Sequence, residues 1–394
     1  MPGSNLQQPS IRLRAHDFIA GRWLVLGYLV LLTGLFWVDN GSLYKKLYYV
    51  LFAAPALLGL ILKPDQISAF LREPVILSFL ALAAWTLISV SWTRADGDVT
   101  GLVKRPLYVF MLLTGCTLIA LKSETLLLKT LRLGAGLGAL AGLINVALFL
   151  QNGTLGERLI GTGALRNPLL TSHVLGFLCT YWIASWLSRN ERHDWLPILM
   201  VVPLFAALLA TGSRTPLMGI TLTSVWMLVM SRKRTTILIG TLLIAAGAVY
   251  LTFPEVLLNR GTSYRPELWI DALRQAGQHL WFGAGYESQF IFNIPGVGYP
   301  LHDPHNIELA VLLELGLVGL CLWSLMYIFA LLRCLRLRAQ PHFQIASALL
   351  VYGLFAGLTE GGSFLSRPNE SWFLIWIPLA LLCALSIRYR QSQT

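Results

Sequence analysis

The chain has 394 residues, of which 56% are hydrophobic and only 12% are charged, and its mean hydropathy is +0.64. Soluble domains carry about twice that share of charged residues, so a soluble globular protein is excluded. The formal net charge of +11 does not indicate a nucleic-acid partner, because the basic residues are scattered between apolar segments. Anionic lipid in a bilayer is the better partner for such a chain.

Apolar runs long enough to cross a bilayer recur along the whole sequence. We expect an all-α polytopic membrane protein with about twelve transmembrane helices, forming a single integral membrane domain over residues 1–394. A β-barrel would need short alternating segments, which are absent. The first span is expected to be a retained anchor, because no small-residue cleavage site follows it. The expected spans lie near 22–38, 47–62, 74–92, 106–121, 131–150, 171–188, 195–211, 216–230, 235–253, 305–332, 343–358 and 371–387.

The five cysteines lie in apolar runs or at their edges, and none is in a CxxC spacing. This pattern indicates neither a disulfide framework nor a metal site, and we expect no cofactor. The cysteines are Cys116, Cys179, Cys321, Cys334 and Cys383.

The distribution of Lys and Arg predicts that both termini are cytoplasmic, because cytoplasmic loops carry the excess of basic residues. Eighteen of the 30 basic residues fall on the side of the N-terminus, which leaves 30 − 18 = 12 on the outer side. The long polar loop 254–304, between the ninth and tenth spans, is then outside. The outer cations indicate an anionic ligand such as phosphate, unless they pair with outer acids. They are Lys45, Lys46, Arg94, Lys104, Arg105, Arg158, Arg166, Arg214, Arg260, Arg265, Arg274 and Arg367.

Two expected spans begin with a capping residue followed by proline, which is a typical helix start. The eighth span has Thr215 as N-cap and Pro216 at its first position, and the tenth has Asp303 as N-cap and Pro304 next. Both helices would point their positive dipole ends outward, where exposed N–H groups bind anions.

Arg214 and Arg265 would add guanidinium groups suited to phosphate at the same face. Arg265 also precedes a third expected helix, which starts at Pro266 within the outer loop and is amphipathic. We expect this helix to lie along the membrane surface. Its apolar face is expected to consist of Trp269, Leu273, Ala276 and Leu280.

His305 would occupy the first turn of the tenth span, where the helix dipole disfavours the imidazolium form. A neutral imidazole there can act as a general base, and Glu308 on the same face could orient it. His302 is the rival base, although it precedes the expected cap in a turn rich in proline. A polar cap without any catalytic role is the other interpretation.

The order of these residues resembles the O-antigen ligase and polymerase superfamily. The motifs are Ser213 and Arg214 at the head of a late span, then Tyr264-Arg265-Pro266 followed by Trp269 in an outer loop. They continue with WFGAG at 281–285, and with His305-Asn306 leading into ELGLVG at 314–319. The resemblance is sharpest over residues 205–320.

The resemblance implies a C-type glycosyltransferase fold in the bacterial inner membrane, with an active site facing the periplasm. Members use an undecaprenyl-diphosphate-linked glycan as donor without a metal, and the ligase branch transfers it to lipid A–core in lipopolysaccharide biosynthesis. By this resemblance Arg214 and Arg265 would hold the diphosphate, and His305 would deprotonate the acceptor hydroxyl for inverting attack. Further expected substrate contacts are Tyr264, Asn306, Arg158, Arg166 and His302.

The acceptor distinguishes the branches of this superfamily. The polymerase extends another lipid-linked repeat, whereas the protein O-oligosaccharyltransferases modify Ser or Thr and usually carry a longer outer C-terminal region. The short basic tail after the last span therefore favours ligase or polymerase, with ligase preferred. A twelve-helix secondary transporter is the alternative from another class, but it would show related halves and polar groups at mid-span.

Overall fold

The computed structural model describes residues 11–95, 99–153, 157–188, 194–231, 234–236, 238–240 and 264–393. Within this part of the chain the elements are helices, and the extended pairing is one isolated antiparallel bridge between Phe292 and Leu301. The first half contains α1 (Ile11–Phe18), η1 (Ile19–Trp23), α2 (Leu24–Trp37), α3 (Gly41–Tyr48), η2 (Tyr49–Ala53), α4 (Ala54–Leu62), η3 (Pro64–Gln66), α5 (Ile67–Phe70), α6 (Pro74–Ser89), η4 (Val90–Trp92), α7 (Val99–Val103), α8 (Arg105–Lys122) and α9 (Glu124–Asn152). The second half contains α10 (Pro168–Ser188), α11 (Leu196–Ala210), α12 (Thr215–Met230), α15 (Arg265–Ala276), η5 (Gly277–His279), α16 (Ile307–Arg336), α17 (Pro341–Gly357), η6 (Glu370–Phe373) and α18 (Trp376–Gln391).

Seven helical runs in the described residues are long and apolar enough to cross a membrane, which confirms a polytopic helical membrane protein. The expected ninth span, near 235–253, lies mostly outside the described residues, and each other expected span coincides with a described helix. The exact number of spans therefore stays a prediction. The seven runs are Ile11–Trp37, Gly41–Leu62, Pro74–Trp92, Val99–Lys122, Glu124–Asn152, Ile307–Arg336 and Glu370–Gln391.

The first helix begins earlier than expected. Hydropathy placed its start near residue 22, but α1 runs from Ile11 through the π-helical turn η1 into α2, and His16 is buried. The difference arises because hydropathy reports where an apolar stretch begins, whereas a helix continues through polar residues that favour it.

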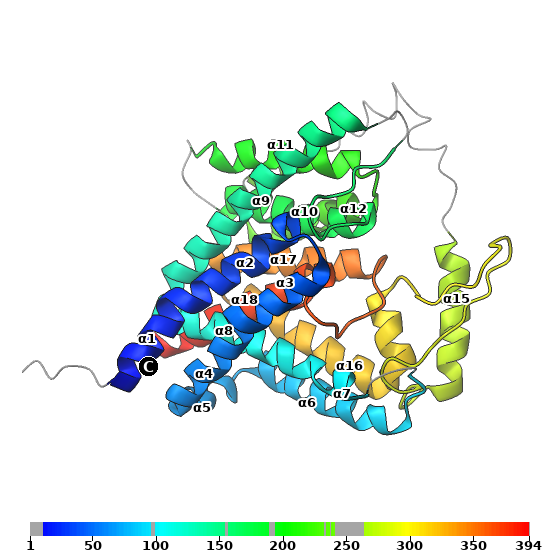
Figure 1. Ribbon diagram of the computed structural model, residues 1–394, viewed down its shortest axis with the longest axis horizontal. Helices are drawn as coiled ribbons and strands as arrows, with labels where there is room; N and C mark the ends of the chain where they lie inside the picture. The colour runs from blue at the N-terminus through cyan, green and yellow to red at the C-terminus, as the bar shows by residue number, and fades with distance from the viewer. Residues whose placement is uncertain are drawn as a thin grey trace, which may run out of the picture.

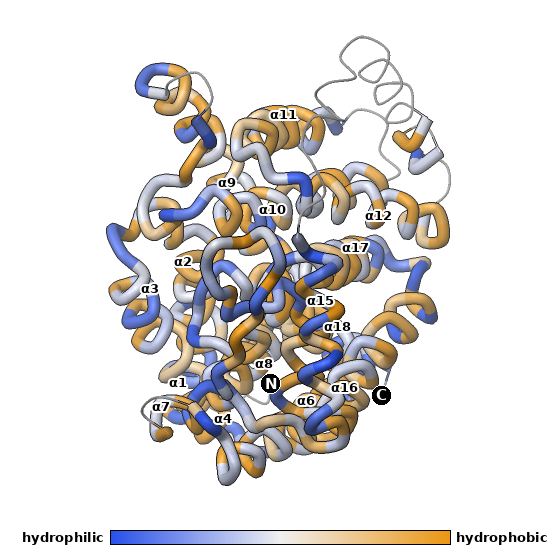
Figure 2. Tube along the Cα trace, turned by 90° about the vertical axis from the view of Figure 1, so that its right-hand side faces the viewer, coloured by the Kyte–Doolittle hydropathy of each residue, from blue (hydrophilic) through white to orange (hydrophobic). Residues whose placement is uncertain are grey.

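Different elements form the two ends of the molecule. Figure 1 shows α1 and the C-terminus at one end and α15 with the segment after it at the other. Seen from the α15 end, hydrophilic segments face the viewer in front of largely hydrophobic helices (Figure 2). The helix α18 runs through the interior, where Trp376 packs edge-on against Trp323 of α16 with 5.9 Å between ring centroids.

The long helix α16 is broken at Gly316, which has a φ of +67°. The WFGAG run at 281–285 fills the break, because Gly285 N–H donates to the Glu314 carbonyl at 2.9 Å and Leu317 N–H donates to the Leu280 carbonyl at 2.8 Å. The indole of Trp85 donates to the Leu315 carbonyl at 3.0 Å. The run and the neighbouring helix thus satisfy backbone groups that the kink exposes.

Two glycines make this close approach of backbones possible. A Cβ at Gly316 would lie 2.4 Å from the Trp281 carbonyl, and one at Gly283 would lie 2.3 Å from the Glu314 carbonyl. Both residues also have positive φ, a region that residues with a Cβ rarely adopt. Glycine at positions 283 and 316 therefore allows the outer loop to pack against α16.

The helix α15 packs against α16 through Leu268, Ala272 and Ala276, which are buried in a cluster that includes Leu312 and Leu313 of α16. Of the four residues expected on its apolar face, Ala276 is buried and Trp269 packs partly against this cluster, whereas Leu273 and Leu280 are exposed. That this helix lies along the membrane surface stays a prediction.

Candidate active site

The turn before α16 positions His305. Asn306 is the N-cap of α16, and its side-chain oxygen accepts from Leu309 N–H at 2.9 Å. The expectation that Asp303 caps this helix was wrong, since its carboxylate accepts from His305 N–H at 2.7 Å within the preceding turn. Both side chains can cap a helix, and the one within reach of a first-turn N–H is Asn306.

His305 lies outside the helix and has a φ of +48°. His305 is therefore not in the first turn of the helix, where it was expected. A residue other than glycine in this region is strained, and such residues cluster at functional sites. The indole of Trp269 donates to the Pro304 carbonyl at 3.2 Å, so α15 holds the turn from its other side.

Two carboxylates face one nitrogen of the imidazole. His305 Nδ1 lies 3.6 Å from Glu360 Oε2 and 3.9 Å from Asp303 Oδ1. Among the described residues Glu308 forms no ion pair with His305, so its expected orienting role was wrong. Glu360 takes that place from the loop between α17 and η6.

Glu360 also forms an ion pair with Arg265 and is almost fully buried. Burial raises the pKa of the Glu360 carboxyl, and the charges of Arg265 and His305 oppose this rise. Sequence reasoning missed Glu360. The available signal was a single carboxylate followed by two glycines, just beyond an apolar span.

The two arginines belong to segments that meet the Glu360 loop. Arg265 is the first residue of α15, and its Nε is buried without a hydrogen bond in the described part of the chain. Arg214 is the N-cap of α12, where Thr215 had been expected. The neighbouring Thr215 hydroxyl accepts from the Thr359 hydroxyl at 3.4 Å, which places the start of α12 beside residue 360.

Two further polar side chains near this cluster were missed by sequence reasoning. His173 Nδ1 and Ser213 Oγ are buried, and neither forms a hydrogen bond within the described residues. The charge of Arg265 acts on His173, so the two side chains are close. Buried polar atoms without partners are rare in native proteins, so both side chains are candidates for contact with a ligand.

Two of the remaining expected contacts, Arg158 and Arg166, are held by backbone carbonyls. Arg158 Nε donates to the Thr211 carbonyl at 2.6 Å, one turn before Arg214. Arg166 instead donates to the Asp39 carbonyl at 3.0 Å, between α2 and α3.

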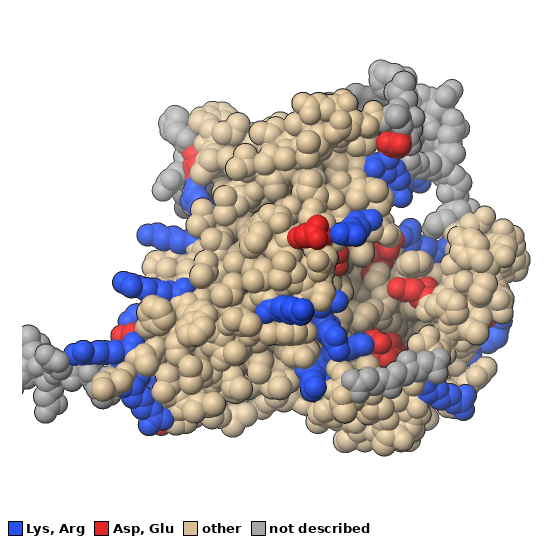
Figure 3. Space-filling view, in the orientation of Figure 1, with Lys and Arg blue, Asp and Glu red and all other residues tan. Residues whose placement is uncertain are grey.

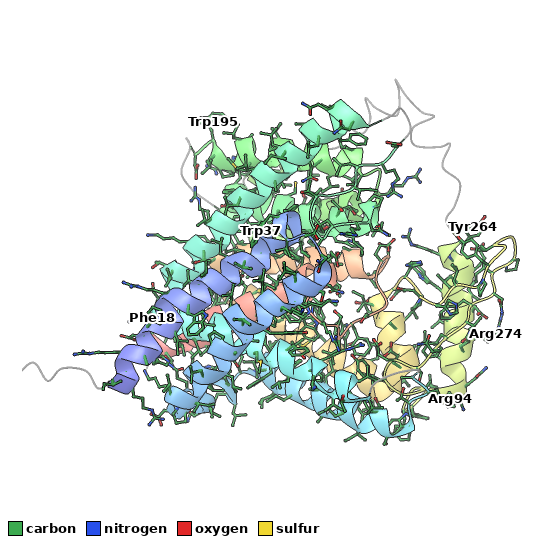
Figure 4. The ribbon with its side chains drawn as sticks, in the orientation of Figure 1. Phe18, Trp37, Arg94, Trp195, Tyr264 and Arg274 are labelled. Carbon is green, nitrogen blue, oxygen red and sulfur yellow. The ribbon has the colours of Figure 1, made fainter. Side chains whose placement is uncertain are left out.

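The other two expected contacts are Tyr264 and His302. Tyr264 is the half-exposed N-cap of α15, and Figure 4 shows it at one end of that helix. His302 Nδ1 lies 3.0 Å from the Phe290 carbonyl, and His302 lines a neighbouring cavity. Figure 3 shows charged residues of both signs along a recess between the α15 side and the remaining helices.

Comparison with known proteins adds to this geometry. A family model described as O-antigen ligase matches residues 199–324, which include Arg214, Arg265 and His305. The chain is 44% identical over 384 residues to the O-antigen ligase of Pseudomonas aeruginosa strain PAO1. That similarity covers 96% of this chain and 95% of the relative. The protein therefore belongs to the O-antigen ligase family.

Proposed function

We propose that the protein transfers a glycan from undecaprenyl diphosphate to a sugar hydroxyl of lipid A–core at the periplasmic face of the inner membrane. Family membership supports a ligase role in lipopolysaccharide biosynthesis. The observation that carries the mechanism is the cluster in which Glu360 contacts both Arg265 and His305.

In this proposal His305 is the general base. Its Nδ1 faces two carboxylates, which favours the tautomer with the proton on Nδ1 and leaves Nε2 to accept a proton. The acceptor hydroxyl loses its proton to Nε2 as its oxygen attacks the anomeric carbon. The bond from that carbon to the diphosphate oxygen breaks, and undecaprenyl diphosphate leaves with the electron pair, so the configuration inverts.

Arg265 and Arg214 bind the diphosphate and stabilise the negative charge that grows on its bridging oxygen. A guanidinium holds phosphate oxygens through two parallel N–H donors, which suits it to this role better than a lysine. The unpaired Arg265 Nε and Ser213 Oγ supply further donors. Fixed positive charge of this kind can replace a metal ion, and we expect the reaction to proceed without one.

A transfer assay with purified protein tests the proposal. The donor is an undecaprenyl-diphosphate-linked glycan, and the acceptor is lipid A–core in the same detergent or vesicle. We expect glycosylated lipid A–core, with unchanged yield after chelation of divalent metals. Donor glycans that lengthen on each other would show a polymerase, and loss of product with the chelator would overturn the metal-free mechanism. If folded protein forms neither product, the transporter interpretation replaces the proposal.

A further inference from the structure

A cavity of about 150 Å³ lies beside the catalytic cluster. Asp303 in its wall belongs to the turn that carries His305, and Gly362 and Ser363 follow Glu360 in the loop after α17. The cavity therefore shares two of its walls with the segments that hold the base. A group bound in it would lie next to the turn that carries His305.

The size and lining of the cavity indicate a particular kind of ligand. An apolar cavity of about 150 Å³ holds one benzene ring, so this space fits one six-membered ring. The lining here is polar, with an aromatic side chain from Phe290, and suits a ring that carries several hydroxyl groups. The polar side chains used in this argument are Glu287, Gln289, His302, Asp303 and Ser363.

Several of these groups are fixed in place and still have capacity for hydrogen bonds. Glu287 pairs with Arg105 at 2.5 Å, which leaves its second carboxylate oxygen as an acceptor. His302 Nδ1 must donate to the Phe290 carbonyl, because a carbonyl oxygen only accepts, so Nε2 is an acceptor when the ring is neutral. The side chains of Gln289 and Ser363 form no hydrogen bond with the described part of the chain.

We propose that this cavity binds the single acceptor sugar, a pyranose of lipid A–core, whose hydroxyl is glycosylated. The inference rests on the proposed function and assigns its acceptor subsite. Asp303 connects the subsite to the base, since its Oδ1 accepts from His305 N–H and lies 3.9 Å from His305 Nδ1. A Cβ at Gly362 would lie 2.5 Å from this carboxylate oxygen, so glycine at 362 leaves room for it.

The assignment also gives the two substrates different contacts. The diphosphate of the donor is bound by Arg265 and Arg214, neither of which is among the residues that line the cavity, and the acceptor ring occupies the cavity next to the His305 turn. Changes in the cavity should therefore weaken acceptor binding without affecting donor binding. This difference makes the subsite testable by steady-state kinetics.

The test uses Gln289→Ala, Ser363→Phe and the control Gln393→Ala, which makes the same Gln-to-Ala change at an exposed position near the C-terminus. Losing one neutral hydrogen bond in Gln289→Ala should raise the acceptor KM about 3- to 10-fold, with kcat and donor KM unchanged. Ser363→Phe should fill the cavity and abolish saturation by acceptor. Gln393→Ala should match the wild type. An increased donor KM, or an unchanged acceptor KM in both folded cavity variants, would overturn the assignment.

A binding measurement keeps this test separate from the fate of the proposed function. Delipidated core oligosaccharide is titrated into each protein without donor, and binding is followed by isothermal calorimetry. Binding to the wild type that is lost in Ser363→Phe supports the subsite even if no transfer to lipid A–core occurs, in which case the proposed reaction alone fails. Equal binding by both proteins would overturn the subsite even if transfer occurs.

Discussion

Glu360 contacts both Arg265 and His305, and its burial affects the stability of the protein. A buried carboxylate is costly unless it is paired, and here Arg265 and the His305 ring supply the compensation. Burying this carboxylate therefore lowers the stability of the folded state, as is common at functional sites.

The raised pKa of Glu360 predicts how stability depends on pH. The folded state binds this proton more tightly than the unfolded chain, whose carboxyl has the ordinary value of 4.5. The tighter binding of this proton adds to the free energy of unfolding. This contribution is fully present below pH 4.5 and is lost as pH rises through the higher pKa of the folded state. We expect the unfolding temperature of the wild type to fall over this range more than that of Glu360→Gln. Parallel pH profiles of the two proteins, measured by thermal unfolding, would contradict the assignment.

The two arginines should be needed for transfer but not for folding. Arg214→Ala and Arg265→Ala each remove charge stabilisation from the leaving group, and we expect kcat to fall about 100-fold or more. Arg274→Ala is the control, because Arg274 is an exposed arginine of α15 that pairs with Asp271 at 3.1 Å. Full activity in either folded site variant, measured by product formation, would remove that arginine from the mechanism.

The sequence identified some of these residues and not others, for a physical reason. Arg214, Arg265 and His305 stand at helix starts or within family motifs, which are local signals. The Arg265–Glu360 contact joins residues 95 positions apart, and no local pattern reports such a pairing. The cap of α16 was misplaced by three residues because Asp303 and Asn306 are both good capping residues, and only the geometry of the turn selects between them.

At the scale of elements, the broken helix α16 is what places the site. Its first half carries the His305 turn, and the WFGAG run fixes that half relative to the outer loop. The helix α15 then packs on the same half through Leu268 and Ala272. Arg265 and His305 are thereby brought to the same loop from two different elements.

Gly316→Ala tests this arrangement. The new Cβ would meet the Trp281 carbonyl at 2.4 Å and would hold alanine at positive φ, so we expect destabilisation by about 2 kcal/mol or more and reduced transfer. Gly277→Ala is the matched control, because Gly277 has a helical φ of −59° and no atom lies within 4 Å of the point where its Cβ would be. Equal unfolding temperatures for the two variants would show that the break tolerates a side chain.

The elements themselves were largely predictable, because membrane-spanning helices are apolar, long and separated by charged turns. Hydropathy could not predict the break at Gly316, since a kink inside an apolar run leaves the composition unchanged. It also did not predict that Leu268 and Ala272 of α15 are covered by α16. Both features depend on contacts between elements rather than on the composition of one element.

At the scale of the whole molecule, the site and the chain ends lie apart. The C-terminus and α1 are at the end opposite α15 (Figure 1). With the excess of basic residues predicting cytoplasmic termini, this separation supports a periplasmic site.

Reporter fusions test this orientation. A fluorescent protein that matures only in the cytoplasm, fused after the last residue, should be fluorescent. An epitope inserted at Gly298, which is exposed and has no neighbouring atoms within 4 Å of its Cβ position, should bind antibody in spheroplasts without permeabilisation. An epitope reached only after permeabilisation would place the site in the cytoplasm and would contradict the proposed reaction.

In the proposed mechanism His305 is the base of a transfer to lipid A–core, and the most direct measurement compares His305→Ala with His302→Ala in the purified transfer assay. We expect His305→Ala to lose about 100-fold or more in kcat, because general base catalysis contributes at least that much. His302→Ala should retain kcat and show a raised acceptor KM. Loss of kcat in His302→Ala with full activity in His305→Ala would contradict the account and would move the base three residues along the chain.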